Sequence, residues 1–226
     1  MKNKLIYSLT LFLCSASPSA AALVFADFND LSLGTQRPQA GGTGFGPSAW
    51  NGTGTIDVIS GDLTAPASTN CGLTQSGNAQ SIFGDYKSAR QNYRSLLTAL
   101  TGDTVWFSFL VQNKTGSSRG GISFNQASWS PGSPRVQTTG KTLYIDGGTG
   151  SGDVFTAGET ALVVGRITVE DAGDDTFDVW MNPDVSGGEA GLGAVTRTRT
   201  GAFFSAAGIT TIAIISYASG AAPPST

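Results

Sequence analysis

Few residues in this chain could carry out acid–base or covalent chemistry. It contains no histidine, which excludes Ser-His-Asp and Cys-His catalysis, histidine metal sites and proton transfer by imidazole. A glycoside hydrolase would instead need two carboxylates about 5 to 9.5 Å apart across the scissile bond. The glutamates are Glu159, Glu170 and Glu189, and none lies in a Glu-x-Asp-x-Glu pattern that would direct two carboxylates into one cleft. Asp178, next but one to Trp180, comes closest to such a pattern, and we expect it to face solvent on a strand.

Calcium is the metal that the composition favours, because the chain offers carboxylate, carboxamide and backbone oxygens but no imidazole. Two acidic turns hold the candidate ligands. The first-turn cluster consists of Asp27, Asn29 and Asp30, and the hairpin cluster consists of Asp171, Asp174 and Asp175. Neither cluster has EF-hand spacing, and acidic turns are more often simply solvated. The sequence therefore predicts either no cofactor or a calcium ion at one of these turns.

Aromatic side chains offer a second kind of site. Sugars present apolar C–H faces, so a lectin-like site needs an exposed ring with polar neighbours that can form hydrogen bonds. Trp129, which follows a polar stretch and precedes a proline, fits this description best. The candidate carbohydrate-binding residues are Trp129, Asn125, Gln126, Trp50 and Tyr144. The competing interpretation is that Trp129 caps the end of a β-sandwich.

Strands must position these residues. The stretch 162–184 predicts an antiparallel hairpin, because apolar residues alternate on both sides of the acidic segment 170–175, which we expect to be a solvated turn. The stretch 104–112 is the clearest single strand. Val105, Phe107, Phe109 and Val111 would line one face, while Trp106 and Leu110 on the other face indicate a central strand. Both Trp106 and Trp180 are expected to pack in the interior.

The rest of the chain predicts further short strands, which its 31 glycines would separate. They are expected at 23–28, 55–59, 81–83, 121–124, 142–146, 196–200 and 209–217. The apolar residues of the stretch 86–100 fit both the spacing of a helix and the alternation of a strand. We expect a strand that ends in a short helical turn. Loops are expected at 34–54, where Phe45 and Trp50 would pin the chain, at 60–80, and at 125–140, which contains Trp129.

The first 22 residues have the pattern of a signal peptide. Lys2 and Lys4 precede an apolar run at 5–14, and small residues at 20–22 match an Ala-x-Ala cleavage site. The apolar run is shorter than the ~20 residues that span a bilayer, and Leu13 before Cys14 does not fit a lipobox. We therefore expect a protein that is secreted or at the cell surface, without a transmembrane span in the mature chain. The domains would be 1–22 signal peptide, 23–220 β-sandwich and 221–226 C-terminal tail.

Charge and cysteine content limit the possible binding partners and disulfides of the protein. The net charge of −3 becomes about −5 once the two lysines of the signal peptide are removed. This acidic balance argues against nucleic acid as a partner. Only Cys71 would remain after cleavage, so no internal disulfide is expected, and a buried thiol is the simplest interpretation.

Four motifs indicate a family. They are FADFNDLSLGT, GGTGFGPSAWNG, DTVWFSFLVQ and LVVGRITVEDAGDDTFDVWMNPD. Together they resemble secreted bacterial proteins of the LamG or concanavalin A-like jelly-roll type, which are often found with PEP-CTERM sorting. Such proteins commonly end in a Pro-Glu-Pro motif, an apolar helix and an arginine cluster, whereas this sequence ends in Ala-Pro-Pro-Ser-Thr. Two alternatives follow: a sorting tail is missing, or this protein is freely secreted.

The sequence thus predicts an all-β protein, an antiparallel two-sheet β-sandwich of jelly-roll, concanavalin A-like type. The expected function is a secreted, non-catalytic module that binds a glycan or polysaccharide. One alternative is a structural or adhesive surface protein with no small ligand. A third is a glycoside hydrolase or lyase, which would require Asp178 to face a second acid across a concave sheet.

Overall fold

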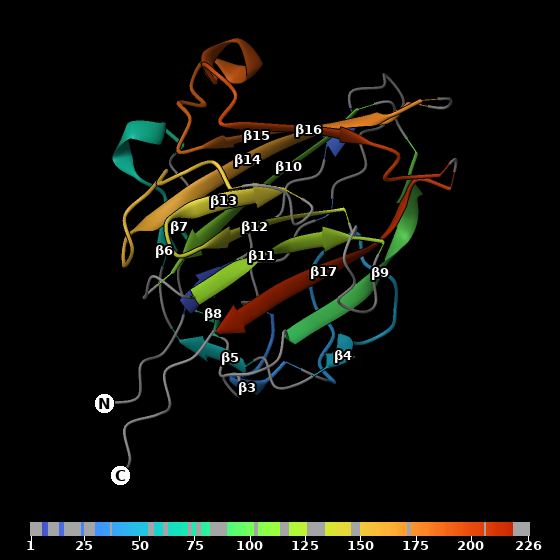
Figure 1. The fold of residues 1–226 in the computed structure, drawn as a ribbon. Helices are drawn as coiled ribbons and strands as arrows, with labels where there is room; N and C mark the ends of the chain where they lie inside the picture. The colour runs from blue at the N-terminus through green and yellow to red at the C-terminus, as the bar shows by residue number, and fades with distance from the viewer. Residues whose placement is uncertain are drawn as a thin grey trace.

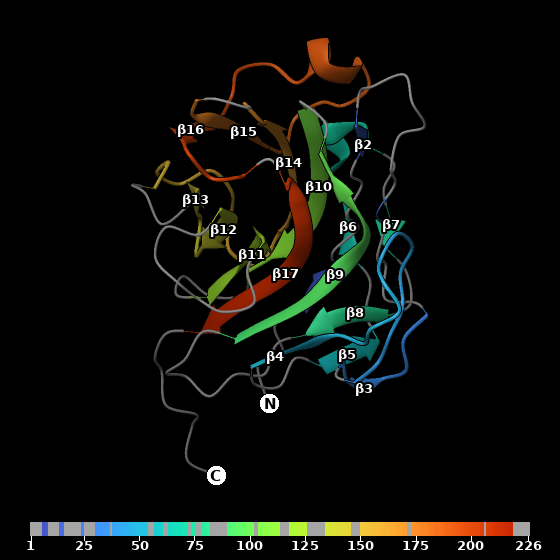
Figure 2. The same cartoon turned by 90° about the vertical axis from the view of Figure 1, so that its right-hand side faces the viewer.

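The fold is an antiparallel β-sandwich, as predicted. The computed structural model describes residues 6–8, 14–15, 24, 30–36, 38–53, 57–60, 63–71, 74–75, 78–81, 90–101, 104–113, 118–125, 134–145, 150–170, 173–205 and 207–218. Every strand pairing in these ranges is antiparallel. Figures 1 and 2 show two sheets that pack against each other. The described residues also include two 3₁₀ turns, η1 (Ala67–Thr69) and η2 (Gly188–Gly191).

The larger sheet has nine strands. Its order is β16 (Arg197–Gly201), β15 (Asp175–Met181), β14 (Thr160–Thr168), β10 (Thr104–Gln112), β1 (Ile6–Ser8), β8 (Asn78–Ser81), β5 (Asp57–Ser60) and β3 (Gly34–Thr35), with β2 (Cys14–Ser15) also on β10. The six-stranded sheet has the order β13 (Thr142–Ile145), β12 (Arg135–Thr139), β11 (Ser118–Phe124), β17 (Ile209–Ala218), β9 (Arg90–Leu100) and β4 (Asn51–Thr53). A separate pair is formed by β6 (Leu63–Thr64) and β7 (Thr74–Gln75).

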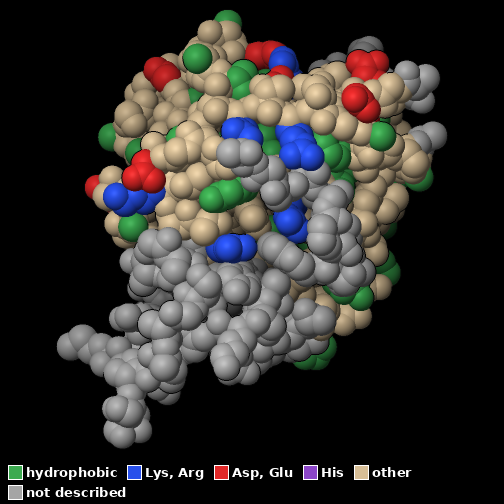
Figure 3. Space-filling view, viewed as in Figure 1, with side chains coloured by type: hydrophobic (Ala, Val, Ile, Leu, Met, Phe, Trp, Pro, Cys, Tyr) green, Lys and Arg blue, Asp and Glu red, His purple; other side chains and the backbone are tan. Residues whose placement is uncertain are grey.

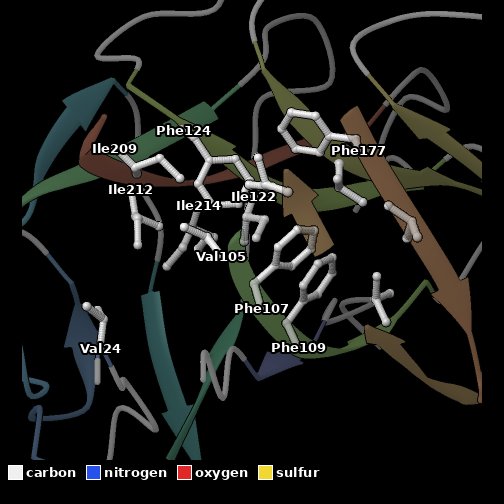
Figure 4. Packing of buried hydrophobic residues seen from close by; sticks show 14 of the residues in the cluster. Val24, Val105, Phe107, Phe109, Ile122, Phe124, Phe177, Ile209, Ile212 and Ile214 are labelled. Atoms are coloured by element: carbon white, nitrogen blue, oxygen red, sulfur yellow. The ribbon is translucent and has the colours of Figure 1, made fainter. Parts of the chain in front are cut away.

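The main core lies between the two sheets. Alternation along β10 directs Phe107 and Phe109 inward, and Phe124 of β11 meets them from the opposite sheet (Figure 4). The ring centroids of Phe107 and Phe124 are 5.3 Å apart, and those of Phe124 and Phe177 are 6.0 Å apart. Gly165 of β14, directly opposite Phe107, leaves room for its ring, because a Cβ atom there would lie 2.0 Å from Phe107 Cζ.

A second apolar cluster covers the outer face of the nine-stranded sheet. Leu110 and Trp180 lie on that face, and Leu63 and Leu192 cover them. Trp106 stacks on Trp180 with a centroid distance of 5.8 Å. These contacts confirm that both tryptophans pack in the structure. The side chain of Cys71 is half-buried against the same cluster, rather than fully buried as expected.

The two strongest strand predictions are confirmed. The predicted hairpin is the pair β14–β15, in which Val163 lies opposite Met181 and Ile167 opposite Phe177. The predicted central strand is β10, which has β14 on one edge and β1 and β2 on the other. The loop with Phe45 and Trp50 is also pinned as expected, since both rings are buried and their centroids are 5.4 Å apart.

Four local predictions are wrong. The expected loop 34–54 contains β3 and β4 at its two ends. The helical turn expected in 86–100 is absent from its described part, because β9 pairs with β17 up to Leu100 and the sheet overrides the helical spacing. The expected loop 125–140 contains β12, whose residues are held by ladders on both sides. The expected loop 60–80 contains β6, η1, β7 and part of β8. Of the predicted strand 23–28, only Val24 is described, and it is buried in the main core.

Two pieces of the predicted signal peptide take part in the sheet. The strand β1 joins β10 to β8, and β2 pairs with β10 at Val105 and Trp106. The domain boundary after residue 22 stays a prediction. Within the described ranges, no helix reaches the length and apolarity needed to span a membrane.

Candidate functional site

An open cleft lies at the end of the sandwich where β14 begins and β15 ends. Its volume is about 530 Å³, within the range of small-ligand sites. In Figure 1, η1 (teal) lies at this end of the sandwich. The described residues that line the cleft are Thr64, Pro66, Ser68, Phe155, Thr156, Glu159, Thr160 and Asn182. The lining therefore combines one ring and one proline with four hydroxyls, one carboxylate and one carboxamide.

The first wall is the segment from β6 through η1. Thr69, which is buried, donates its backbone N–H and its hydroxyl to Pro66 O, at 2.9 and 2.6 Å. Its carbonyl accepts the N–H of Val185 at 2.9 Å, and Asn70 Nδ2 donates to Asp184 Oδ2 at 2.9 Å. These bonds tie the wall to the loop that follows β15, so Pro66 and Ser68 have a fixed position at the cleft.

The second wall is the segment 155–160. A turn is closed by the N–H of Glu159, which donates to Thr156 O at 3.2 Å, and Gly158 has φ +90° at the third position of that turn. A positive φ at this position is typical of a type II turn and explains the glycine. The N–H of Gly158 donates to the carbonyl of Asn113 at 2.8 Å. This bond anchors the turn, and with it Glu159, to the end of β10.

The floor is formed where the β14–β15 hairpin opens. Asn182 has φ +50°, and its Oδ1 accepts the N–H of Leu162 at 2.8 Å. This bond fixes the carboxamide and leaves Nδ2 to donate to a ligand. The hydroxyl of Thr160 accepts Gln112 Nε2 at 3.4 Å and can donate its own proton. Phe155 is half-buried and packs against the main core, so its ring has a firm support.

Asn125, predicted to bind sugar, is a structural residue. Its Oδ1 accepts the N–H groups of Thr210 and Thr211, at 2.6 and 3.3 Å, and its Nδ2 donates to Gly208 O at 2.5 Å. Asn125 also has φ +55°, at the exit of β11, and its side-chain bonds tie this exit to the beginning of β17. Both ends of its amide are used within the chain. Trp129 and Gln126 lie outside the described residues, and their role stays a prediction.

Trp50 and Tyr144 do not meet in one site. Trp50 is 2% exposed, so its ring is not available to a ligand on the surface, and its proposed sugar contact is corrected. It precedes β4 at one edge of the six-stranded sheet, whereas Tyr144 lies in β13 at the other edge. Tyr144 is half-exposed and points away from the core, with Gly150 beside its ring.

Asp175, one of the candidate calcium ligands, is buried. Asp175 is 1% exposed and is the first residue of β15, not part of a solvated turn. Its carboxylate accepts backbone N–H groups of Glu170, Phe203 and Phe204 at 3.1, 2.8 and 2.7 Å. Its oxygens are therefore used within the fold, which corrects its assignment as a metal ligand.

The remaining candidates give no assembled metal site in the described ranges. Asp174 is exposed, and Asp30 Oδ2 accepts the N–H of Gly42 at 2.5 Å. Asp27, Asn29 and Asp171 lie outside the described residues. Within the ranges that are described, no group of three or more His, Cys, Asp or Glu residues could hold a metal ion.

Asp178 is buried, contrary to the expectation that it faces solvent. It is 7% exposed, and its two oxygens accept Arg166 Nη2 at 2.6 Å and Thr198 Oγ1 at 2.7 Å. Arg166 also pairs with Glu189, and its guanidinium lies 5.7 Å from the ring centroid of Trp106. The hydrogen bond to Asp178 raises the pKa of Arg166 above its ordinary value. The group is thus a structural ion pair on the covered face of the hairpin.

Charge is unevenly distributed over the surface. Figure 3 shows Lys and Arg side chains in the middle of the face formed by the six-stranded sheet, with Asp and Glu toward its margins. By contrast, Glu159 is the only ionisable side chain among the described residues that line the cleft. The cleft is therefore a weakly acidic site on an acidic protein.

Sequence reasoning missed the cleft. Its walls come from 64–68 and 155–160, which lack the tryptophans and acidic runs that drew attention elsewhere. The available signal was an enrichment in small hydroxyl residues next to Phe155 and Pro66. That signal does not reveal that the two segments meet.

Comparison of the chain with protein-family models, curated protein sequences and solved structures found no match.

Proposed function

We propose that this protein is a non-catalytic glycan-binding module that acts outside the cell or at its surface. The observation that carries the proposal is the composition of the cleft. A half-buried ring can stack on the apolar face of a sugar, while hydroxyls, a carboxamide and a carboxylate can bind its hydroxyl groups. The extracellular location rests on the signal-peptide pattern at 1–22.

The anchoring of the walls supports binding rather than a site that must first assemble. Both walls are held by backbone hydrogen bonds of 2.8 to 2.9 Å, at Gly158–Asn113 and at Val185–Thr69. A preformed site loses less conformational entropy on binding, which favours affinity for a weakly interacting sugar. The described lining residues include a single carboxylate, which fits binding better than hydrolysis, a reaction that uses two.

A steric block tests the proposal. The purified full chain is screened on a glycan array, and the best soluble oligosaccharide is then titrated calorimetrically against Ser68→Trp. Ser68 is exposed in the cleft wall, so the new ring fills the cleft without altering the core. We expect affinity to fall at least about tenfold, or about 1.4 kcal/mol. Ala202→Trp, at an exposed position after β16, is the matched control and should bind normally.

The same titration separates the cleft from the loop predicted to bind sugar. Trp129→Ala should leave binding unchanged if the cleft is the site. Equal affinities of Ser68→Trp and Ala202→Trp would reject the cleft. Absence of saturable binding to every soluble oligosaccharide would reject the proposed function and favour the structural or adhesive alternative.

A further inference from the structure

We infer that Glu159 makes the cleft selective for uncharged glycans over glycans that carry carboxylate or sulfate groups. This inference rests on the proposed function and adds the chemical class of the ligand. Glu159 is then a specificity-determining residue. Its carboxylate attracts sugar hydroxyls, which can donate hydrogen bonds to it, and repels the negative charge of acidic sugars.

The position of Glu159 is fixed by the turn that bears it. Its N–H closes the turn on Thr156 O, and the preceding Gly158 is bonded to Asn113 O at 2.8 Å. The positive φ of Gly158, +90°, sets the direction in which the chain leaves the turn toward Thr160 of β14. The carboxylate therefore belongs to a held segment at the cleft, not to a free loop.

No compensating positive charge lines the cleft in the described part of the chain. The other described lining residues carry hydroxyl, carboxamide or apolar side chains. Lys141, on the strand connection before β13, pairs instead with Asp153 at 3.8 Å. Among the described lining residues, an anionic sugar in the cleft would consequently meet a carboxylate and no cation that could neutralise it.

An uncharged sugar matches the same groups. A carboxylate has two acceptor oxygens, and a pair of neighbouring sugar hydroxyls can donate one hydrogen bond to each. Asn182 supplies the complementary donor, because its Oδ1 is already bonded to Leu162 N–H and its Nδ2 remains. The hydroxyl side chains can act as donor or acceptor. This pattern suits a ring with several free hydroxyls.

The test compares two versions of one ligand. A neutral hexose oligosaccharide from the array and its C6-oxidised uronic acid counterpart are titrated at low and high salt. Like charges about 4 Å apart in water repel by about 1 kcal/mol, so the wild type should prefer the neutral form about fivefold. The preference should shrink in 1 M salt, where the screening length is about 3 Å.

Two variants identify the source of the preference. Glu159→Gln keeps the shape but removes the charge, so the affinity ratio should approach one. Glu170→Gln removes the same charge from an exposed position beyond the other end of β14 and should keep the wild-type ratio. Melting temperatures confirm that both variants fold.

The outcomes are distinct. Binding of both ligands with equal affinity by the wild type, or an unchanged ratio in Glu159→Gln, would overturn the inference while leaving glycan binding in place. Failure of the wild type to bind either form would overturn the proposed function and the inference together.

Discussion

Replacing Asp175 should destabilise the fold more than any change at its acidic neighbours. Its buried carboxylate holds the backbone at Phe203 and Phe204, whose rings pack on Phe177 with centroid distances of 5.2 and 5.8 Å. Asp175→Ala removes the acceptor for these N–H groups and for that of Glu170. The change therefore affects both hydrogen bonding and the aromatic packing that it secures.

The magnitude follows from the three donors. Glu170 is exposed, so its N–H can bond to water, whereas Phe203 and Phe204 are half-buried. An unsatisfied buried donor costs about 1–3 kcal/mol, so two of them give about 4 kcal/mol for Asp175→Ala. Asp175→Asn keeps one carbonyl oxygen for the phenylalanine pair, and we expect a loss of about 1–2 kcal/mol. Stabilities of whole domains are only about 5–15 kcal/mol.

Urea denaturation followed by tryptophan fluorescence measures the effect. The midpoint should fall in the order wild type, Asp175→Asn, Asp175→Ala, with little change in the slope of the transition. Asp174→Ala, at the exposed neighbouring position, is the control and should change stability by less than about 0.5 kcal/mol. If Asp175→Ala and Asp174→Ala unfolded at the same urea concentration, the structural role of this carboxylate would be refuted.

Three further predictions concern packing, titration and metal binding. Gly165→Ala should lower the free energy of unfolding by about 1–3 kcal/mol, measured by urea denaturation, because the new Cβ would overlap the buried ring of Phe107. A stability within about 0.5 kcal/mol of wild type would contradict this. Hydrogen bonds from Ser186 and then Asn70 hold the pKa of Asp184 below its ordinary value of 3.8, so its stabilising effect is complete above the unfolded pKa and is lost as the pH falls through the folded pKa. Carbon NMR titration should show a higher Asp184 pKa in Asn70→Ala, and an unchanged value would argue against the bond. If calcium binds the first-turn cluster, saturation at about 100 times its Kd should add ~2.7 kcal/mol to folding stability, and equal melting temperatures in calcium and in chelator would reject that site.

The parts of the fold that the sequence predicted are those with a local pattern. Alternating apolar residues identified β10, β14 and β15, because a strand with one buried face must repeat every two residues. The strand β17 was identified by its apolar, β-branched run. The same reasoning failed for β12, since Arg135 and Gln137 give it polar residues that are nevertheless buried. For β9 it predicted the strand but also a helical end that is wrong, since Leu96 and Leu100 have helical spacing but lie buried in the strand.

The candidate site was less predictable because its environment is created by distant segments. Asp178 was expected to face solvent, but residues after β15, including Glu189 and Leu192, cover that face of the hairpin. Asp175 was assigned to a solvated turn, but its partners at Phe203 and Phe204 follow much later in the chain. Local composition correctly indicated that these segments are acidic. It could not show which carboxylate oxygens accept hydrogen bonds from distant parts of the chain.

The bond between Asn70 and Asp184 joins residues 114 positions apart, and it belongs to a wall of the cleft. Closing so long a loop is entropically costly and is rewarded only after β14 and β15 have paired. We therefore expect the β14–β15 hairpin to form before the cleft wall docks on it. In a refolding experiment, glycan capture should therefore lag behind strand formation. Under the proposed function, glycan binding would then report that the cleft wall and the β14–β15 hairpin have reached their native arrangement.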